Sequence, residues 1–223
     1  MSTDLKSGAN LIGGILASGQ VQSGQLLTIS GSPTGGTFTV SVTTSAGTQT
    51  TSGQAYNVAA SALQTALQGL SNVGSGNLLV SGSAGGPYTI TAPTGFVCTL
   101  ATSGASLTGG TSPSASLAGI AATVYTVPST TSAAVVKTAV VTSVAASAVP
   151  VTGYVTPQGQ TRDSTRIVGL SGYSLAAGDA TVWSEVQGGV YDSTGSSGAA
   201  FALVLGGGAV NAVNYMITGA VQS

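Results

Sequence analysis

Charged residues are scarce in this chain. Its 223 residues include four Lys or Arg and five Asp or Glu, whereas about one residue in four is charged in an ordinary soluble domain. The segment between Lys6 and Lys137 contains none. Such a surface has little electrostatic repulsion to keep copies apart. We therefore expect much of it to contact other protein; the alternative is a Ser, Thr and Gly surface that stays soluble through hydroxyl and backbone groups.

Histidine is absent, which removes the commonest general base and a leading metal ligand. No two acidic residues are close in sequence, and no calcium-loop, Gly-x-Ser-x-Gly or phosphate-loop motif occurs. Four scattered basic residues cannot form a phosphate-binding stripe. We therefore expect no enzymatic activity, no cofactor, no metal and no nucleic-acid partner.

A long apolar run is also missing. The best candidate for a membrane-spanning helix, residues 133–149, contains Lys137 and is too short and too rich in β-branched residues. The N-terminus lacks the basic and apolar regions of a secretory signal, so we expect cytoplasmic synthesis and no membrane partner. Cys98 is the only cysteine, and its apolar neighbours predict a buried core thiol.

The first half of the chain predicts a compact unit of strands around one helix. A half-buried strand is expected at 36–44, where the apolar residues Phe38, Val40 and Val42 alternate with hydroxyl residues. Residues 58–70 carry an apolar stripe at helical spacing, and Asn57 stands at the expected N-cap. Further strands are expected at 25–30, 77–81, 87–91 and 95–100, and a loop or linker at 101–118, which is rich in Ser, Gly, Ala and Thr.

The remaining segments predict an all-β domain and an N-terminal extension. About seven short strands separated by Gly and Pro turns are typical of a sandwich or jelly roll. The Gly13-Gly14 pair disfavours a helix, so residues 1–22 are expected to be an extended arm or first strand. The expected C-terminal strands are 122–127, 133–144, 149–156, 164–170, 180–185, 199–205 and 213–221.

Several C-terminal motifs resemble the β-sandwich domains of phage virion proteins, especially capsid-surface and fibre-associated ones. In those domains an apolar lead, here residues 16–21, runs almost directly into a Tyr-Thr-Val-Pro strand, whereas here about a hundred residues intervene. The matching segments are Val124–Pro128, Ala134–Val141, Asp163–Ile167, Ser174–Asp179 and Val213–Gly219.

The intervening residues resemble a second module, common in virion proteins of phages that infect actinobacteria. The matching segments are Gly36–Val40, Ala55–Leu67, Asn72–Val80 and Gly85–Ile90. Together the two resemblances cover most of residues 16–221, and they depart at 188–198, where a longer segment replaces a short acidic turn. They imply a mainly β fold: a jelly-roll-like β-sandwich base (1–22, arm and first strand; 119–223, sandwich domain) with a small inserted α+β module containing one helix (23–118).

The resemblance implies a structural virion protein: a capsid decoration or minor capsid protein that binds and stabilises the outer surface of a phage head. Its expected partners are the major capsid protein and itself, as a homotrimer, and its expected location is the virion after synthesis in the host cytoplasm. The alternative is a tail or fibre appendage that binds a host receptor or glycan. A hydrolase would need a base, and an ice-binding protein would need more regular Thr-x-Thr rows than segments such as 37–39 and 89–91 provide.

The N-terminal arm is the expected contact with the capsid or a neighbouring subunit. Deletion of residues 1–21 is then expected to abolish capsid binding and leave the fold intact. One charge cluster is either a local ion pair at a loop or a polar anchor to a partner. The expected apolar contacts are Leu11, Ile12, Ile15, Leu16 and Val21, and the charge cluster is Arg162, Asp163 and Arg166.

Overall fold

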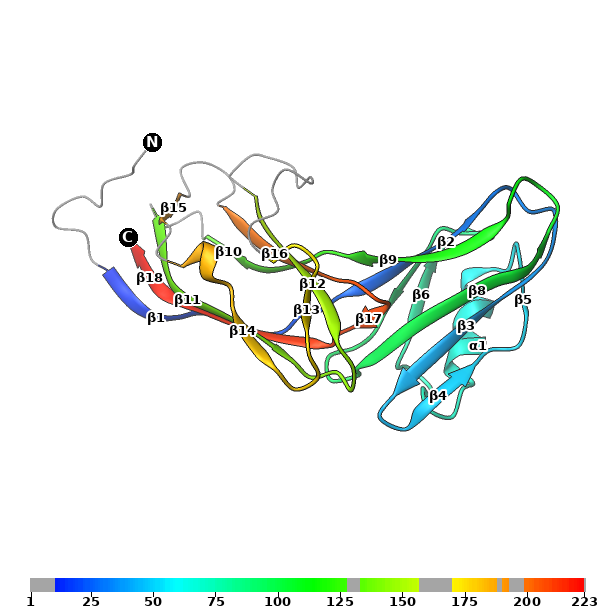
Figure 1. Cartoon of the computed structure of the whole chain (residues 1–223), viewed down its shortest axis with the longest axis horizontal. Helices are drawn as coiled ribbons and strands as arrows, with labels where there is room; N and C mark the ends of the chain where they lie inside the picture. The colour runs from blue at the N-terminus through cyan, green and yellow to red at the C-terminus, as the bar shows by residue number, and fades with distance from the viewer. Residues whose placement is uncertain (1–10, 128–132, 157–169, 188–189, 193–198, 223) are drawn as a thin grey trace.

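The computed structural model describes residues 11–127, 133–156, 170–187, 190–192 and 199–222. This part of the chain is mainly β, with four antiparallel sheets and one α-helix, in a β-sandwich-like arrangement (Figure 1). The predicted fold class, mainly β with one helix, is confirmed. Two sheets surround each of two separate hydrophobic cores, and we call the corresponding halves the base and the module.

The base contains both described ends of the chain. One sheet has the order β1 (Leu11–Gln20), β18 (Val213–Gln222), β11 (Ala133–Ser143) and β14 (Ala180–Val182), and β15 (Val190–Asp192) also pairs with β11. The other has the order β10 (Ala122–Thr126), β16 (Ala200–Leu205), β12 (Val149–Thr156) and β13 (Tyr173–Leu175). The N-terminal segment is therefore the edge strand of a sheet.

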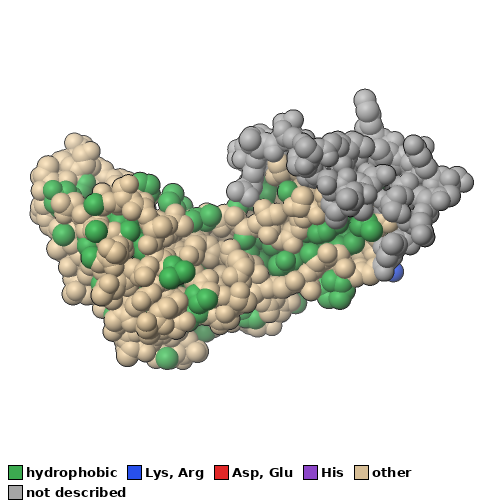
Figure 2. All heavy atoms as spheres, turned by 180° about the vertical axis from the view of Figure 1, so that it is seen from behind, with side chains coloured by type: hydrophobic (Ala, Val, Ile, Leu, Met, Phe, Trp, Pro, Cys, Tyr) green, Lys and Arg blue, Asp and Glu red, His purple; other side chains and the backbone are tan. Residues whose placement is uncertain are grey.

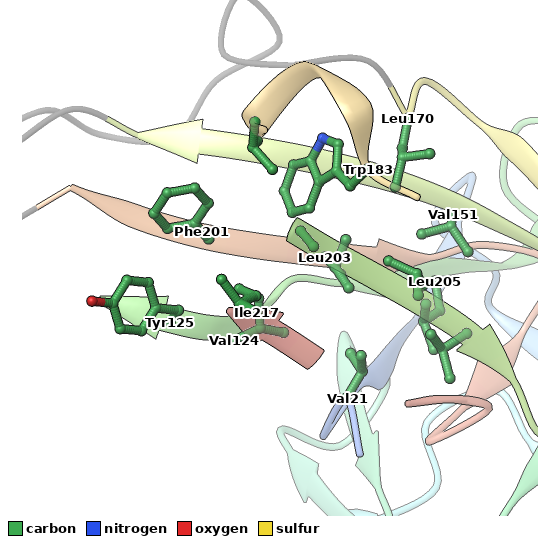
Figure 3. Packing of buried hydrophobic residues seen from close by; sticks show 14 of the residues in the cluster. Val21, Val124, Tyr125, Val151, Leu170, Trp183, Phe201, Leu203, Leu205 and Ile217 are labelled. Carbon is green, nitrogen blue, oxygen red and sulfur yellow. The ribbon is translucent and has the colours of Figure 1, made fainter. Parts of the chain in front are cut away.

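The base core is organised around Phe201 of β16 (Figure 3). Its ring centroid lies 5.6 Å from that of Tyr125, 6.3 Å from that of Trp183 and 4.6 Å from that of Tyr191. The Trp183 and Tyr191 rings meet it edge-on, which is a favoured aromatic geometry. Trp183 directly precedes the 3₁₀ helix η2 (Ser184–Val186). Four aromatic residues from separate segments of the base therefore meet in or against its core.

The module lies between β1 and β10 in the sequence and carries the helix α1 (Ala60–Gln68). Leu63 and Leu67 of α1 pack with the inward-facing residues of its sheets, including Phe38 and Ile90. One sheet has the order β6 (Leu79–Gly82), β7 (Tyr88–Thr91), β2 (Gly24–Ser30) and β9 (Ser114–Ile120). The other has the order β17 (Ala209–Val210), β8 (Cys98–Thr108), β3 (Gly35–Thr44) and β4 (Gly47–Thr50), and β5 (Gln54–Ala55) pairs with β3.

The prediction of a loop over residues 101–118 is wrong, because most of this segment belongs to β8 and β9. β8 pairs with β3 from Thr108 opposite Gly35 to Thr99 opposite Thr43. Most of its side chains beyond Leu100 are small and at least partly exposed. Its strand conformation therefore comes from backbone pairing with β3, which a hydrophobicity pattern does not report.

Other boundaries also differ from the sequence predictions. The helix has Ala59, not Asn57, at its N-cap, because a turn closed by the Val58 amide donating to the Ala55 carbonyl precedes it. The strand expected at 180–185 ends at Val182 and is followed by η2. The short strands β13, β15 and β17 were not predicted. Most of the strand expected at 164–170 lies outside the described residues.

A strand crosses from the base to the module. After β16, the chain turns at Gly206–Gly208 and forms β17, which pairs with β8 of the module. The Leu100 amide donates to the Gly208 carbonyl at 2.8 Å, and the side chain of Val210 is buried in the module core. The two halves therefore share a sheet edge as well as two chain connections.

Two fully buried amide side chains add to this junction. Gln25 of β2 donates through Nε2 to the carbonyls of Leu205 (3.2 Å), the last residue of β16 in the base, and Ala209 (2.8 Å), the first residue of β17. Asn211 of the base donates through Nδ2 to the carbonyls of Ala92 (3.2 Å) and Pro93 (3.0 Å) in the module. These reciprocal bonds hold module and base together end to end (Figure 1).

Candidate interaction surface

The chemical groups needed for a metal centre are not gathered in the described part of the chain. No cluster of three or more His, Cys, Asp or Glu residues occurs there. Among the same residues, no helix has the length and apolarity needed to cross a membrane. Cys98 is buried as predicted, and burial raises the pKa of its thiol to about 12, so the reactive thiolate is suppressed at neutral pH. The candidate functional sites that remain among the described residues are the surfaces of the base and of the module.

Val21, one of the predicted contact residues, is a core residue. Its side chain is fully buried in the base, near Leu205 and Val124 (Figure 3), and its amide donates to the Val213 carbonyl at 2.8 Å. The prediction that Val21 contacts a partner is wrong, because its apolar side chain already fills the base. Deletion of residues 1–21 would remove β1 and this core residue, so it is not a test that leaves the fold intact.

The other predicted contacts in β1 divide between the two faces of the sheet. Leu16 occupies a bulge in the pairing with β18 and packs partly buried against the base core. Ile15 faces outward and is 65% exposed. The backbones of Leu11 and Ile12 pair with Gln222 and Val221, but their side chains lie outside the described residues. Ile15 is therefore the predicted contact that the structure places on the surface.

The predicted polar anchor cannot be placed. Arg162, Asp163 and Arg166 all lie outside the described residues. The charged side chain that can be located on the sheet of β1 is Lys137, which is exposed in a bulge of β11. In Figure 2, the described surface is formed almost throughout by apolar and uncharged side chains, with blue at one end and no red visible.

The solvent-facing side of the β1 sheet carries an apolar row. Ser18, Met216, Val140 and Val182 lie opposite one another on β1, β18, β11 and β14. Met216 is 41% exposed and Val182 is 46% exposed. Ile15 lies on the same face, in the next row, where it pairs with Thr218 of β18. We define the outer face of the base as Ile15, Ser18, Thr138, Val140, Val182, Met216 and Thr218.

The distribution of exposed large hydrophobic residues separates the halves. Among the described residues, the base exposes Ile15, Val144, Tyr173, Val182 and Met216, whereas the module exposes Leu79. Exposed apolar residues that lie together mark contact surfaces more often than isolated ones do. The base is therefore the half whose surface is suited to contact with protein. The sequence signal for this was available in β18, where Met216 alternates with the buried Ile217 and Val213.

The edge of β1 adds backbone groups to this surface. Within the described chain, β1 pairs with β18 alone and is the first strand of its sheet. Natural edge strands are commonly protected from pairing by charged residues, Pro or bulges. β1 has a bulge at Leu16 but contains no charged residue and no Pro. Part of this edge can therefore accept another strand.

The module presents hydroxyl groups in place of apolar ones. On the outward side of β3 and β4, Ser41 pairs with Thr50 and Thr43 with Thr48, each through a 2.8 Å hydroxyl hydrogen bond. The outward residues of the neighbouring β8 include Ser103, which lies opposite Thr39. The four hydroxyls of β3 and β4 bond to one another in pairs. This face is therefore polar and neutral.

The described surface includes a concavity at the junction and another at the end of the module. One, of about 260 Å³, lies between the module and the base and is lined by the β3–β4 turn, the start of β8 and residues 144–147. The other, of about 580 Å³, lies at the end of the module and is lined by three of its connections. Comparison of the chain with protein-family models, curated proteins and solved structures gives no match.

Proposed function

We propose that this chain is a non-enzymatic structural protein of a phage virion, which binds the outer surface of the head and stabilises it. The observation that carries the proposal is the outer face of the base: a row of apolar side chains next to an edge strand whose one protective feature is the bulge at Leu16, on a chain almost without ionisable groups. The motifs shared with virion β-sandwich domains direct the proposal to the head surface.

The base docks on the capsid and the module points away from it. This orientation is supported by the concentration of exposed apolar side chains on the base and of hydroxyl groups on the module. An uncharged, hydroxyl-covered module remains hydrated when it projects into solvent, whereas the outer face of the base gains free energy when capsid protein covers it. The occupant of that face is therefore a neutral, apolar patch on the major capsid protein.

The protein acts as a homotrimer at three-fold or quasi-three-fold positions. A capsid repeats each binding site many times, so three linked copies can bind far more tightly than one without any new type of contact. The test is the mass of the complex released from heads or assembled in solution by light scattering. We expect three times the chain mass of 21.3 kDa; a monomer under both conditions contradicts the trimer.

Capsid binding can be tested with matched surface variants. Ile15→Lys and Met216→Lys place a charge on the outer face of the base, and Leu79→Lys places one on an equally exposed site of the module. Purified protein is added to heads of a phage that lacks its gene, and occupancy is measured by sedimentation. We expect both base variants to bind at least about tenfold more weakly, because burying an unpaired charge is costly. Leu79→Lys should bind as the unmodified chain does; the reverse pattern would overturn the proposed orientation.

The salt dependence of the same binding tests its chemical basis. The Debye length falls to roughly 3 Å at 1 M salt, which weakens exposed ion pairs but not apolar contacts. We expect occupancy on heads to be retained in about 1 M NaCl. Release of the protein at that salt concentration would show that charge pairs hold the interface.

A further inference from the structure

The concavity at the end of the module has the position and composition of a ligand site. It has a volume of about 580 Å³ and is formed by the β2–β3, β5–α1 and β6–β7 connections. β2 starts at the junction, where Gln25 binds the base, and ends at Ser30 on the rim of the concavity. At about 3.4 Å per residue, the rim lies roughly 17 Å beyond the junction. It is at the end of the molecule remote from both described chain ends (Figure 1).

Hydrogen bonds to neighbouring segments fix the walls of this concavity. The fully buried Tyr88 donates its hydroxyl to the Val58 carbonyl at 2.6 Å and accepts from the Gly85 amide at 3.0 Å, which ties the β6–β7 connection to the start of the helix. On the opposite wall, the Thr111 amide donates to the Gly31 carbonyl at 2.8 Å. The site is therefore formed before a ligand arrives, which lowers the entropic cost of binding.

The β2–β3 wall also adopts an unusual backbone conformation. Ser32 has a φ of 51°, in the left-handed region that residues other than Gly rarely occupy. It lies next to Pro33 at the rim of the concavity. Non-glycine residues in this region occur disproportionately at binding sites, where the surrounding structure holds them. This conformation is consistent with a wall shaped for contact with a ligand.

The lining combines one aromatic ring with small neutral hydrogen-bonding groups. Tyr56 is half-buried, packs on one side against the module core, and lines the concavity. Asn57, exposed beside it, offers both a donor and an acceptor, and Ser30 and Ser32 contribute hydroxyls from the facing wall. No lining residue is Asp, Glu, Lys or Arg. The site therefore suits a neutral ligand with an apolar face and several hydroxyls, and has no means of neutralising a phosphate or carboxylate.

We propose that this concavity binds a neutral saccharide, with a sugar ring against Tyr56 and its hydroxyls bonded to Asn57 and the facing serines. A sugar ring has an apolar C–H face and a rim of hydroxyls, which matches this lining. The inference goes beyond the proposed function and does not require it: a head protein that docks through its base would present the concavity outward, toward the surface of a cell.

The proposal is tested on the purified full-length chain, without capsids. Saturation-transfer NMR is run against a panel of neutral oligosaccharides built from glucose, galactose, mannose and arabinose. We expect transfer to at least one of them, reduced at least about fivefold by Tyr56→Ala and by Asn57→Ala. Tyr173→Ala, which removes an exposed tyrosine from the base, should bind as the unmodified chain does.

The outcomes separate this proposal from its rivals. No transfer from any neutral saccharide overturns it, as does binding that survives both Tyr56→Ala and Asn57→Ala. Binding of neutral Ser- and Pro-rich peptides in place of saccharides would assign the concavity to a protein ligand. Circular dichroism shows whether Tyr56→Ala unfolds the module. If it does, Asn57→Ala still tests saccharide binding, because the Asn57 side chain is exposed and its loss should not disturb the fold. Loss of capsid binding in the base variants leaves these results unaffected.

Discussion

The base and the module differ in both charge and surface: residues 23–118 contain no charged residue, whereas all nine charged residues lie at 1–22 or 119–223. In β3 of the module, apolar residues point inward and hydroxyl residues outward, so the sheet is apolar on one side. In β11 and β18 of the base, Val140 and Met216 place apolar side chains on the outer side too, beside Thr138 and Thr218. Exposed apolar side chains that lie together are typical of contact surfaces. The comparison shows that scarcity of charge alone does not make a surface apolar: the uncharged module exposes hydroxyl groups, and the half that carries the charged residues exposes more large apolar side chains.

The cores of the two halves also differ, and separate reporters can follow each. The single tryptophan, Trp183, lies in the base core, and the single cysteine, Cys98, lies buried in the module. Tryptophan fluorescence therefore reports unfolding of the base, and reaction of the thiol with a disulfide reagent reports unfolding of the module. The first two predictions below use both signals.

The largest expected effect is truncation of the aromatic cluster. Phe201→Ala removes a fully buried ring that contacts three other aromatic rings and should lower the free energy of unfolding of the base by about 3–5 kcal/mol. In urea denaturation, the fluorescence transition should move to lower concentration by more than the thiol transition. Leu63→Ala in α1 is the counterpart and should move the thiol transition by about 2–5 kcal/mol. Equal shifts in both signals for both variants would show that the halves unfold as one unit.

The junction should determine how far the two transitions coincide. Gln25→Leu keeps the volume of the side chain but leaves the carbonyls of Leu205 and Ala209 without their donor. We expect a loss of about 1–3 kcal/mol and a wider separation between the fluorescence and thiol transitions. The control is Gln49→Leu, which replaces a partly exposed glutamine that bonds to Ser71 within the module. A Gln25→Leu chain whose transitions stay together would mean that β17 and the Asn211 hydrogen bonds suffice to couple the halves.

Alternation of apolar residues allowed most of this fold to be predicted. The strands β3, β11, β12 and β16 were expected within about a residue or two of their observed bounds, because each buries every second side chain for much of its length. β8 beyond Leu100 was missed because its partner, and not its own side chains, holds it in a strand. β17 was not predicted, because a strand of two residues is too short to show a periodic pattern.

The candidate surfaces were harder to predict than the fold. Apolar character singled out β1, but it does not distinguish Val21, which fills the core, from Ile15, which faces solvent. The bulge at Leu16 changes the face on which the following side chains lie, and no sequence signal marks it. The concavity at the end of the module brings together Pro33, Tyr56 and Gly85, which are distant in sequence. Such a site depends on the packing of three connections, so it could not be predicted from local pattern.

Alkaline pH should destabilise the module through Cys98. Burial raises the pKa of its thiol from 9.0 to about 12 in the folded chain. Below pH 9 the thiol is neutral in both states, so stability is unaffected; above it the unfolded state loses the proton while the folded state keeps it. The free energy of unfolding should then fall by about 1.4 kcal/mol per pH unit up to pH 12. Because tyrosines also titrate in this range, the free energy of unfolding of the unmodified chain is compared with that of Cys98→Ala at each pH by circular dichroism. The prediction is contradicted if the two free energies fall equally with pH.

The smallest expected effect is at the start of α1, and it returns to a boundary that the sequence pattern placed wrongly. Ala59 occupies the N-cap with φ −70° and ψ 147°, and its side chain makes no capping bond. Ala59→Ser supplies an oxygen for a free amide of the first turn and should stabilise the module by about 1 kcal/mol in the thiol transition. Ala62→Ser puts the same residue inside the helix, where the lower helix propensity of Ser should cost about 0.5 kcal/mol. Asn57→Ala should leave the stability of the module unchanged, because Asn57 lies before the turn that sets the helix start; a loss of about 1 kcal/mol there would restore Asn57 as the cap and weaken its assignment to the saccharide site.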